Sequence, residues 1–231
     1  MATGTTPIET GMGEIYAQTA VNFGAARPAS LGLGEVWNAI NAAILNFTPP
    51  SGSDIYLAPA GATAQSIPRT MVSSAAEALG GTGVLVMQAI FLPANTVVNN
   101  LNWVAGTTAA ITPTHQWGGL YNASRVQLAT TTDGLTTAIT SGLTLTYPIA
   151  TVAAGAATTF TTTYTGMYYM GLLITAGTMP TVEGATGIAT AATIPPILSG
   201  TSTGSLTTPT TFPTTAGTIT PTAPQIYCYT T

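Results

Sequence analysis

His115 is the only histidine of the chain and the first residue to consider for chemistry. Thr114 precedes it and Asp133 follows, so the residue types of a Ser/Thr–His–Asp hydrolase are present. No nucleophile-elbow motif accompanies them, and a chain this rich in threonine offers such combinations by chance. We therefore predict that the protein is not an enzyme and has no catalytic residues, and that His115 is a loop residue beside Pro113.

Metal and cofactor chemistry have little support in the sequence. One histidine, one cysteine and seven dispersed acidic residues provide no ligand spacing for zinc or for an EF-hand. The glycine pairs Gly80-Gly81 and Gly118-Gly119 lack the context of a nucleotide-binding loop, so they are predicted to be turns and strand bends. No cofactor and no metal are predicted.

Three further residues have two possible interpretations. A single Cys228 excludes an internal disulfide framework; it is either a small tolerated residue, which we favour, or an intermolecular bridge or reactive thiol. Trp103 and Trp117 are predicted core residues, and the alternative is an exposed aromatic platform that contacts a glycan.

Charge is scarce throughout the 231 residues. Charged residues make up 4% of the chain, lysine is absent and the net charge is −4. Without a basic stripe, neither nucleic acid nor an anionic membrane surface is an expected partner. The mean hydropathy is +0.40, yet the longest apolar run, Val84 to Leu92, is about half the length of a bilayer span. No secretory signal is expected at the N-terminus.

Such a composition is poorly protected against association, because interspersed charges normally keep protein surfaces apart. We therefore expect much of the surface to be covered by copies of the chain or by other proteins in a larger assembly.

Residues 1–82 are predicted to be an N-terminal arm, one helix and a connector. Residues 35–47 have the apolar spacing of a short amphipathic helix, which Pro49-Pro50 ends. The helix packs either on its own β domain or on a neighbouring subunit. In the second case the interface residues are Val36, Trp37, Ile40, Ile44 and Phe47.

Residues 83–183 have the pattern of a sandwich of short antiparallel strands. Apolar runs of strand length alternate with Gly, Pro, Asn and Thr. A hairpin is predicted around the Asn122-Ala123-Ser124 turn. In the run MYYMGLLI, residues 168, 170, 172 and 174 share one face and residues 167, 169 and 173 share the other. Both faces are apolar, so this strand is expected to be covered on both sides.

The same module resembles a β-sandwich found in virion proteins of tailed bacteriophages. The matching residues are Gly119-Leu120-Tyr121-Asn122-Ala123-Ser124, Leu128-Ala129-Thr130, Gly166, Tyr168-Tyr169, Gly171-Leu172-Leu173 and Gly177-Thr178-Met179-Pro180-Thr181. The resemblance implies a mainly β, jelly-roll-like antiparallel sandwich without a catalytic signature.

Residues 184–231 are rich in Thr and Pro and are predicted to be an extended C-terminal tail. Periodic apolar residues favour an ordered extension that adds to a sheet edge or crosses to an adjacent subunit, with Ile226 and Tyr227 as interface residues.

Together these features predict a non-enzymatic structural protein of a phage virion. It is expected to form homo-oligomers on the head exterior as a decoration or minor capsid protein that bridges neighbouring subunits, with the major capsid protein as favoured partner. The alternative is a minor tail or tail-fibre protein whose sandwich binds a host-surface carbohydrate.

Overall fold

The computed structural model describes residues 58–186, 194–202, 211–221 and 224–231. The strands are β1 (Ala64–Gln65), β2 (Ser73–Ala78), β3 (Leu85–Leu92), β4 (Val97–Val98), β5 (Asn100–Val104), β6 (Ile111–Tyr121), β7 (Gln127–Thr131), β8 (Thr144–Val152), β9 (Gly155–Ala156), β10 (Phe160–Thr161), β11 (Gly166–Thr178), β12 (Thr181–Thr186), β13 (Ser199–Ser202), β14 (Ile219–Pro221), β15 (Pro224–Ile226) and β16 (Cys228–Thr230). A short 3-10 turn, η1, spans Arg69–Met71. The described chain is therefore mainly β, as the sequence predicts.

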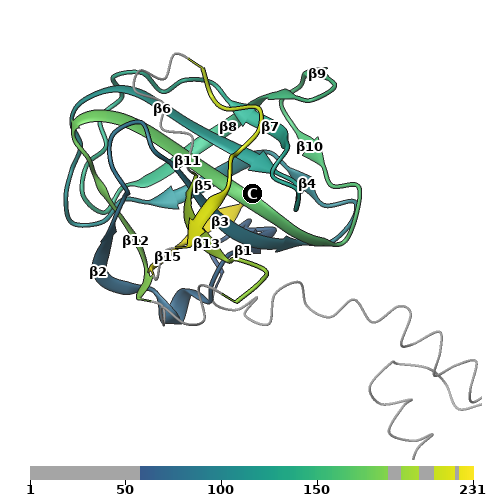
Figure 1. The fold of residues 1–231 in the computed structure, drawn as a ribbon, viewed down its shortest axis with the longest axis horizontal. Coiled ribbons are helices and arrows are strands. Elements are labelled where there is room, and N and C mark those ends of the chain that lie inside the picture. The colour runs from purple at the N-terminus through teal and green to yellow at the C-terminus, as the bar shows by residue number, and fades with distance from the viewer. Residues whose placement is uncertain (1–57, 187–193, 203–210, 222–223) are drawn as a thin grey trace, which may run out of the picture. The chain divides into compact units, whose positions relative to one another are not determined.

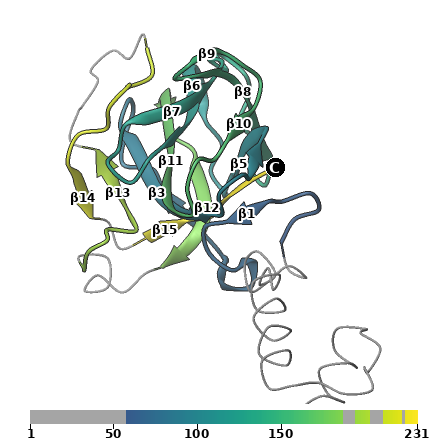
Figure 2. The same ribbon diagram turned by 90° about the vertical axis from the view of Figure 1, so that its right-hand side faces the viewer.

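Most strands belong to one antiparallel, 11-stranded sheet (Figures 1 and 2). The strand order is β1-β16-β5-β8-β7-β6-β11-β3-β13-β14, and β9 pairs with β8. Two smaller sheets consist of β10 with β4, and of β15, β12 and β2. Neighbours in the large sheet are often far apart in the sequence, so the sheet depends on long-range pairing.

Strand β8 lies between β5 and β7 and so joins the β1-β16-β5 part of this sheet to the rest. Residues 144–148 pair with β5, and residues 149–152 pair with β7. Its side chains alternate between exposed and buried as far as Ile149, which is the pattern of a strand with one face on a core. Trp103 of β5 and Tyr168 of β11 belong to the same hydrophobic cluster, so distant stretches of the sheet enclose one core.

Strand β11 lies between β6 and β3 and is buried on both faces. The first face contributes to the main core and the second to a smaller cluster. The residues of the first face are Tyr168, Met170, Leu172 and Ile174, and those of the second are Met167, Tyr169 and Leu173. The predicted alternation and the predicted double cover are both confirmed.

The second face of β11 is covered by the chain's own residues 211–221. Phe212 and Ile219 belong to the same cluster as Trp117 and Tyr121 of β6, and the Tyr121 hydroxyl donates a 2.7 Å hydrogen bond to the carbonyl oxygen of Pro213. Gly119 makes this close packing possible, because a Cβ at that position would collide with the Phe212 ring.

The predicted hairpin is formed by β6 and β7. The Asn122 backbone N–H donates to the Val126 carbonyl, and Arg125 takes a positive φ of 66° to close the turn. The Ala216 N–H donates to the Arg125 carbonyl, so the hairpin end also contacts the covering segment.

The last strand, β16, enters the large sheet between β1 and β5, and β15 pairs with β12, so the C-terminal extension adds to sheets of its own chain, which is one of the two predicted alternatives. Ile226 and Tyr227, the predicted partner-interface residues, are instead covered by this chain. Cys228 lies opposite Trp103, and Tyr229 lies opposite Gln65. Ile226 is 4% exposed and Tyr227 is 2% exposed, both within this chain. The sequence predicts that these two apolar side chains are buried, but the periodicity of apolar residues does not specify which strand edge a segment joins.

Strands from outside residues 83–183 therefore belong to the same sheets as strands from inside this range. The predicted connector contains η1 and β2. The predicted helix at residues 35–47, with Val36, Trp37, Ile40, Ile44 and Phe47, lies outside the described residues.

Candidate functional site

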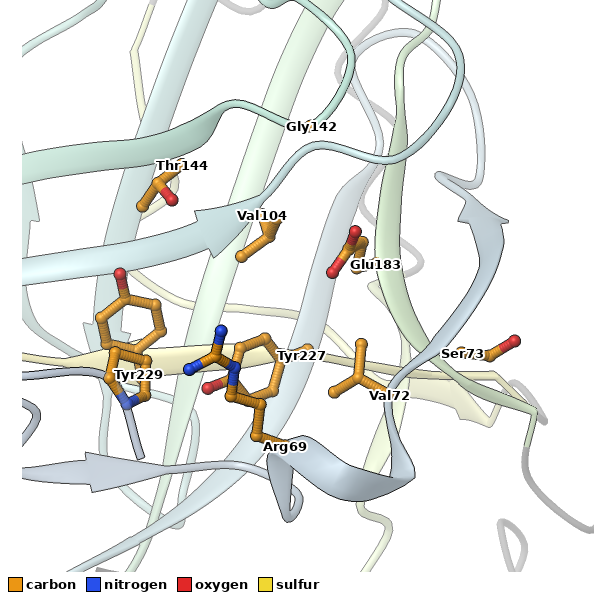
Figure 3. A pocket seen from close by; sticks show the side chains of 10 residues that line it. Arg69, Val72, Ser73, Val104, Gly142, Thr144, Glu183, Tyr227 and Tyr229 are labelled. Atoms are coloured by element: carbon orange, nitrogen blue, oxygen red, sulfur yellow. The ribbon is translucent and has the colours of Figure 1, made fainter. Parts of the chain in front are cut away.

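A cavity of about 530 Å³ is the candidate site (Figure 3). Its walls come from η1, β5, β12, β16 and the loop before β8. This volume falls within the range of small-molecule sites in proteins. The side chains that matter for binding are Arg69, Glu183, Tyr227, Tyr229 and Thr144.

Local backbone structure places the two charged side chains. The η1 turn carries Arg69 and is closed by hydrogen bonds from the Met71 N–H to the Pro68 carbonyl and from the Val72 N–H to the Arg69 carbonyl. Val182 of β12 points into the main core and is fully buried, so its neighbour Glu183 points to the opposite side, toward the cavity.

Arg69 and Glu183 are not paired with each other. The one ion pair within the described residues joins His115 and Asp133, and neither the Arg69 guanidinium nor the Glu183 carboxylate makes a side-chain hydrogen bond to a described residue. Arg69 is exposed and Glu183 is half-buried. Two opposite charges therefore line one cavity without neutralising each other.

Two tyrosines form an aromatic wall of the cavity. The ring centroids of Tyr227 and Tyr229 lie 5.9 Å apart at an angle of 35°, and both rings pack with Ile67 in a small cluster apart from the main core. The Tyr227 hydroxyl lies 3.2 Å from Oε1 of Gln65. Burial raises the pKa of Tyr227 to about 12, although Arg69 acts to lower it, so this phenol is neutral at physiological pH.

His115 lies in strand β6 rather than in the predicted loop. Its Nδ1 lies 2.6 Å from Oδ2 of Asp133, while Oδ1 of Asp133 accepts hydrogen bonds from the N–H groups of Gln116 and Leu135. The imidazole also stacks on Trp117, with centroids 5.0 Å apart. These contacts attach the segment after β7 to β6.

The carboxyl of Asp133 is held ionised by these contacts. Partial burial raises its pKa, but the hydrogen bonds from His115, Gln116 and Leu135 outweigh that effect and leave the pKa below its usual value.

The two described threonines nearest to this pair in the strands, Thr114 and Thr175, do not offer it a hydroxyl nucleophile. Thr114 is adjacent to His115 on the strand, so its side chain points to the other face, where it donates to the Thr175 carbonyl. Thr175 is the cross-strand partner of His115, but its Oγ1 is buried and has no hydrogen-bond partner within the described residues. This arrangement favours a structural role for the pair.

The predicted glycan platform at Trp103 and Trp117 is corrected by their burial. Trp103 is 1% exposed and packs edge-on against Tyr147, and Trp117 is 6% exposed in the smaller cluster. Neither indole presents a free face to a sugar ring, so the core interpretation of both residues is confirmed.

Cys228 is fully buried in the main core, and burial raises the pKa of its thiol to about 12. A buried, protonated thiol suits the interpretation as a small core residue and not a reactive one.

Sequence reasoning did not identify Arg69, Glu183 or Tyr229 as site residues. Charged residues are so rare in this chain that each of them could have been considered as a candidate site residue. Nothing in the sequence spacing, however, shows that residues 69 and 183 lie beside the same cavity. Tyr227 was singled out, although for a partner interface.

Two broader observations apply to the described residues. No helix among them is long and apolar enough to cross a bilayer. They also contain no group of three or more His, Cys, Asp and Glu side chains arranged to hold a metal ion. A scan against protein-family models finds no family that matches the chain, and a search of curated proteins finds no matching relative.

Proposed function

We propose that this chain is a non-enzymatic structural protein of a tailed-phage virion, located on the head exterior as a decoration or minor capsid protein. The resemblance of the module between Gly83 and Glu183 to a virion β-sandwich supports the class of protein. A jelly-roll-like strand path is part of the same proposal.

The observation that supports it best is a surface with few charges and large exposed apolar side chains. The charged residues of the described segments are Arg69, Glu77, Arg125, Asp133 and Glu183. Met71, Phe91 and Ile111 are each more than half exposed, at 62%, 62% and 59%. Exposed apolar surface with so little charge is typical of proteins that remain in contact with neighbours.

The proposed role needs no chemical step. Apolar surface buried between this chain, its own copies and the major capsid protein stabilises the assembled shell, because binding that occurs only in the assembled state shifts the equilibrium toward it. Several weak contacts made at once also bind more tightly than each contact alone. Neither nucleic acid nor membrane is a proposed partner.

Self-association is the first test of this role. We expect the sedimentation coefficient of the purified chain to rise with protein concentration, and to do so equally at about 0.05 M and about 0.5 M NaCl, because apolar contacts are not screened by salt. A chain that stays monomeric at high concentration would contradict the proposal.

Location on the particle is the second test. Electron microscopy of particles that carry a tagged copy should show the tag on the head, and deletion of residues 1 to 47 should lower the temperature at which heads release DNA. A tag at the tail tip would favour the alternative, a minor tail or tail-fibre protein that binds a host carbohydrate. That alternative no longer has the platform predicted for it, because Trp103 and Trp117 are buried.

A further inference from the structure

We propose that a groove beside strand β8 receives an extended strand from a second copy of this chain, and that residues 15–23 are the segment that enters it. The groove has a volume of about 360 Å³. It is lined by Gln116, by residues between 132 and 138, and by the consecutive residues 143–148, and we call it the β8 groove. The inference rests on the proposed self-association and names the surface through which it occurs.

The β8 groove forms where the large sheet splits. Strands β7 and β8 separate beyond the pair Thr131 and Ile149. The chain after Thr131 follows β6 instead, because the Gly134 N–H donates to the Gln116 carbonyl. Residues 144–148 of β8 therefore pair with β5 on one side and have no described strand on the other.

The free side of β8 presents backbone hydrogen-bonding groups to the groove. In an antiparallel ladder, alternate residues direct both their N–H and their C=O to the same neighbouring strand. The Ile149 N–H and the Leu143 carbonyl bond to the residues that flank β5, so the odd-numbered residues of this stretch face β5. The N–H and C=O groups of Thr144 and Thr146 therefore face the groove, where no described residue is their hydrogen-bond partner.

This arrangement specifies the chemical class of the ligand. The groove wall contains buried residues of β8, such as Leu145, and exposed ones, such as Thr146, so the backbone edge forms it and not one side-chain face. Donors and acceptors that alternate along a strand edge are complementary to another extended backbone. The ligand is therefore a polypeptide strand.

The sequence of residues 15–23, IYAQTAVNF, suits this role, although the segment lies outside the described residues. It contains no Gly, no Pro and no charged residue, so each backbone N–H is present and the ionised Asp133 at the groove does not repel it. Its pattern is that of a strand with one apolar face, made of Ile15, Ala17, Val21 and Phe23.

The chain is also long enough for this contact. Residues 24–57 connect the segment to the described chain, and this length allows the segment to reach a neighbouring molecule. The second copy is therefore the occupant that the sequence itself supplies.

The test is a fluorescence-polarisation titration of the full chain with a labelled peptide of residues 14–24. We expect saturable binding of this peptide, and binding at least about tenfold weaker for a peptide with the same residues in scrambled order. Excess unlabelled peptide should also lower the sedimentation coefficient of concentrated protein, because the peptide replaces the segment of the second copy.

The first variant removes one backbone donor from the groove. Thr146→Pro deletes the N–H that faces the groove, and Pro148 shows that β8 accommodates proline at a position that faces the same way. We expect the affinity for the peptide to fall about tenfold. Thr146→Val is the matched control, because it keeps the N–H and should leave the affinity unchanged.

The second variant fills the groove. Ala138 is exposed and lines it, so Ala138→Phe should abolish binding of the peptide. Ala123→Phe makes the same change at an exposed position that does not line the groove, and it should bind as the wild type does. A cooperative urea transition would show that each variant is folded.

Three results would overturn the proposal. They are equal affinity for the ordered and the scrambled peptide, wild-type affinity of Ala138→Phe, and a lack of saturable binding at about 1 mM peptide. Self-association that is unaffected by excess peptide would also contradict it, while the proposed virion function would stand.

Discussion

At the scale of single residues, Asp133 shows how a rare charge is used. Its two carboxylate oxygens contact the His115 side chain and the backbone N–H group of Gln116, both in β6, and the N–H group of Leu135 in the segment after β7. The side chain of Asp133 is 20% exposed, so these bonds are partly shielded from water. Such charge-assisted bonds are stronger than neutral ones.

We therefore predict that Asp133→Ala lowers the free energy of unfolding by about 2 kcal/mol at pH 7. The pKa of Asp133 is lower in the folded than in the unfolded chain, so the stabilisation from its charge is complete above about pH 4 and is lost as the pH falls through the lower, folded pKa. Urea denaturation between pH 7 and pH 2 measures this difference.

Asp133→Asn is the control, because it keeps one acceptor oxygen and has no charge to titrate. We expect a smaller loss of stability than for Asp133→Ala, without the pH dependence that this carboxyl contributes. Equal stability of Asp133→Ala and wild type at pH 7 would contradict the role given to this residue.

At the scale of elements, β11 depends on a cover that comes from elsewhere in the same chain. Its second face contacts a cluster completed by Phe212 and Ile219, which lie far from it in the sequence. Phe212 is 8% exposed and packs beside Gly119 and Tyr121. The covering segment therefore belongs to the core, although its composition is that of a linker.

Phe212→Ala is predicted to lower the free energy of unfolding by about 3 kcal/mol, because it leaves a cavity under the cover. Phe91→Ala removes the same side chain from an exposed position of β3 and should cost less than about 1 kcal/mol. Urea denaturation of both variants compares the two positions. Similar losses would show that the cover contributes little to stability.

Local patterns predicted some elements well. The alternation in residues 167–174 identified a strand buried on both faces, and the turn after Tyr121 identified a hairpin, because both signals lie within a few consecutive residues. The burial of Ile226 and Tyr227 depends on where the adjoining strands pair, β15 with β12 and β16 with β5, and neither partner strand is a neighbour in the sequence. The sequence of a strand indicates which of its two faces is apolar, but it does not indicate which other strand it pairs with.

The candidate site was harder to predict for the same reason. Arg69 lies in a 3-10 turn, Glu183 in β12 and Tyr229 in β16, and none of these residues has a motif around it. The His115–Asp133 pair was visible as residue types, but its distance of 2.6 Å depends on the pairing of β6 with β7.

At the scale of the whole molecule, the large sheet is completed by residues from both ends of the described chain. We predict that deletion of residues 224–231, which removes β15 and β16, abolishes cooperative unfolding, because it leaves β5 with an unpaired edge and removes Ile226 and Cys228 from the core. Near-UV circular dichroism during a urea titration measures this loss.

The matched control is deletion of residues 1–47, which keeps every described strand and should retain a cooperative transition. A truncation at residue 223 that still unfolds cooperatively would show that the last strands are dispensable.

The position of β16 also has a consequence for biosynthesis. A ribosome makes β1 and β5 long before Cys228–Thr230, so the nascent chain carries an open strand edge beside Trp103 until these residues have been made. An exposed edge of this kind readily pairs with other newly made chains. Heterologous expression should therefore yield more native protein when translation is slowed by cooling or when chaperones are supplied.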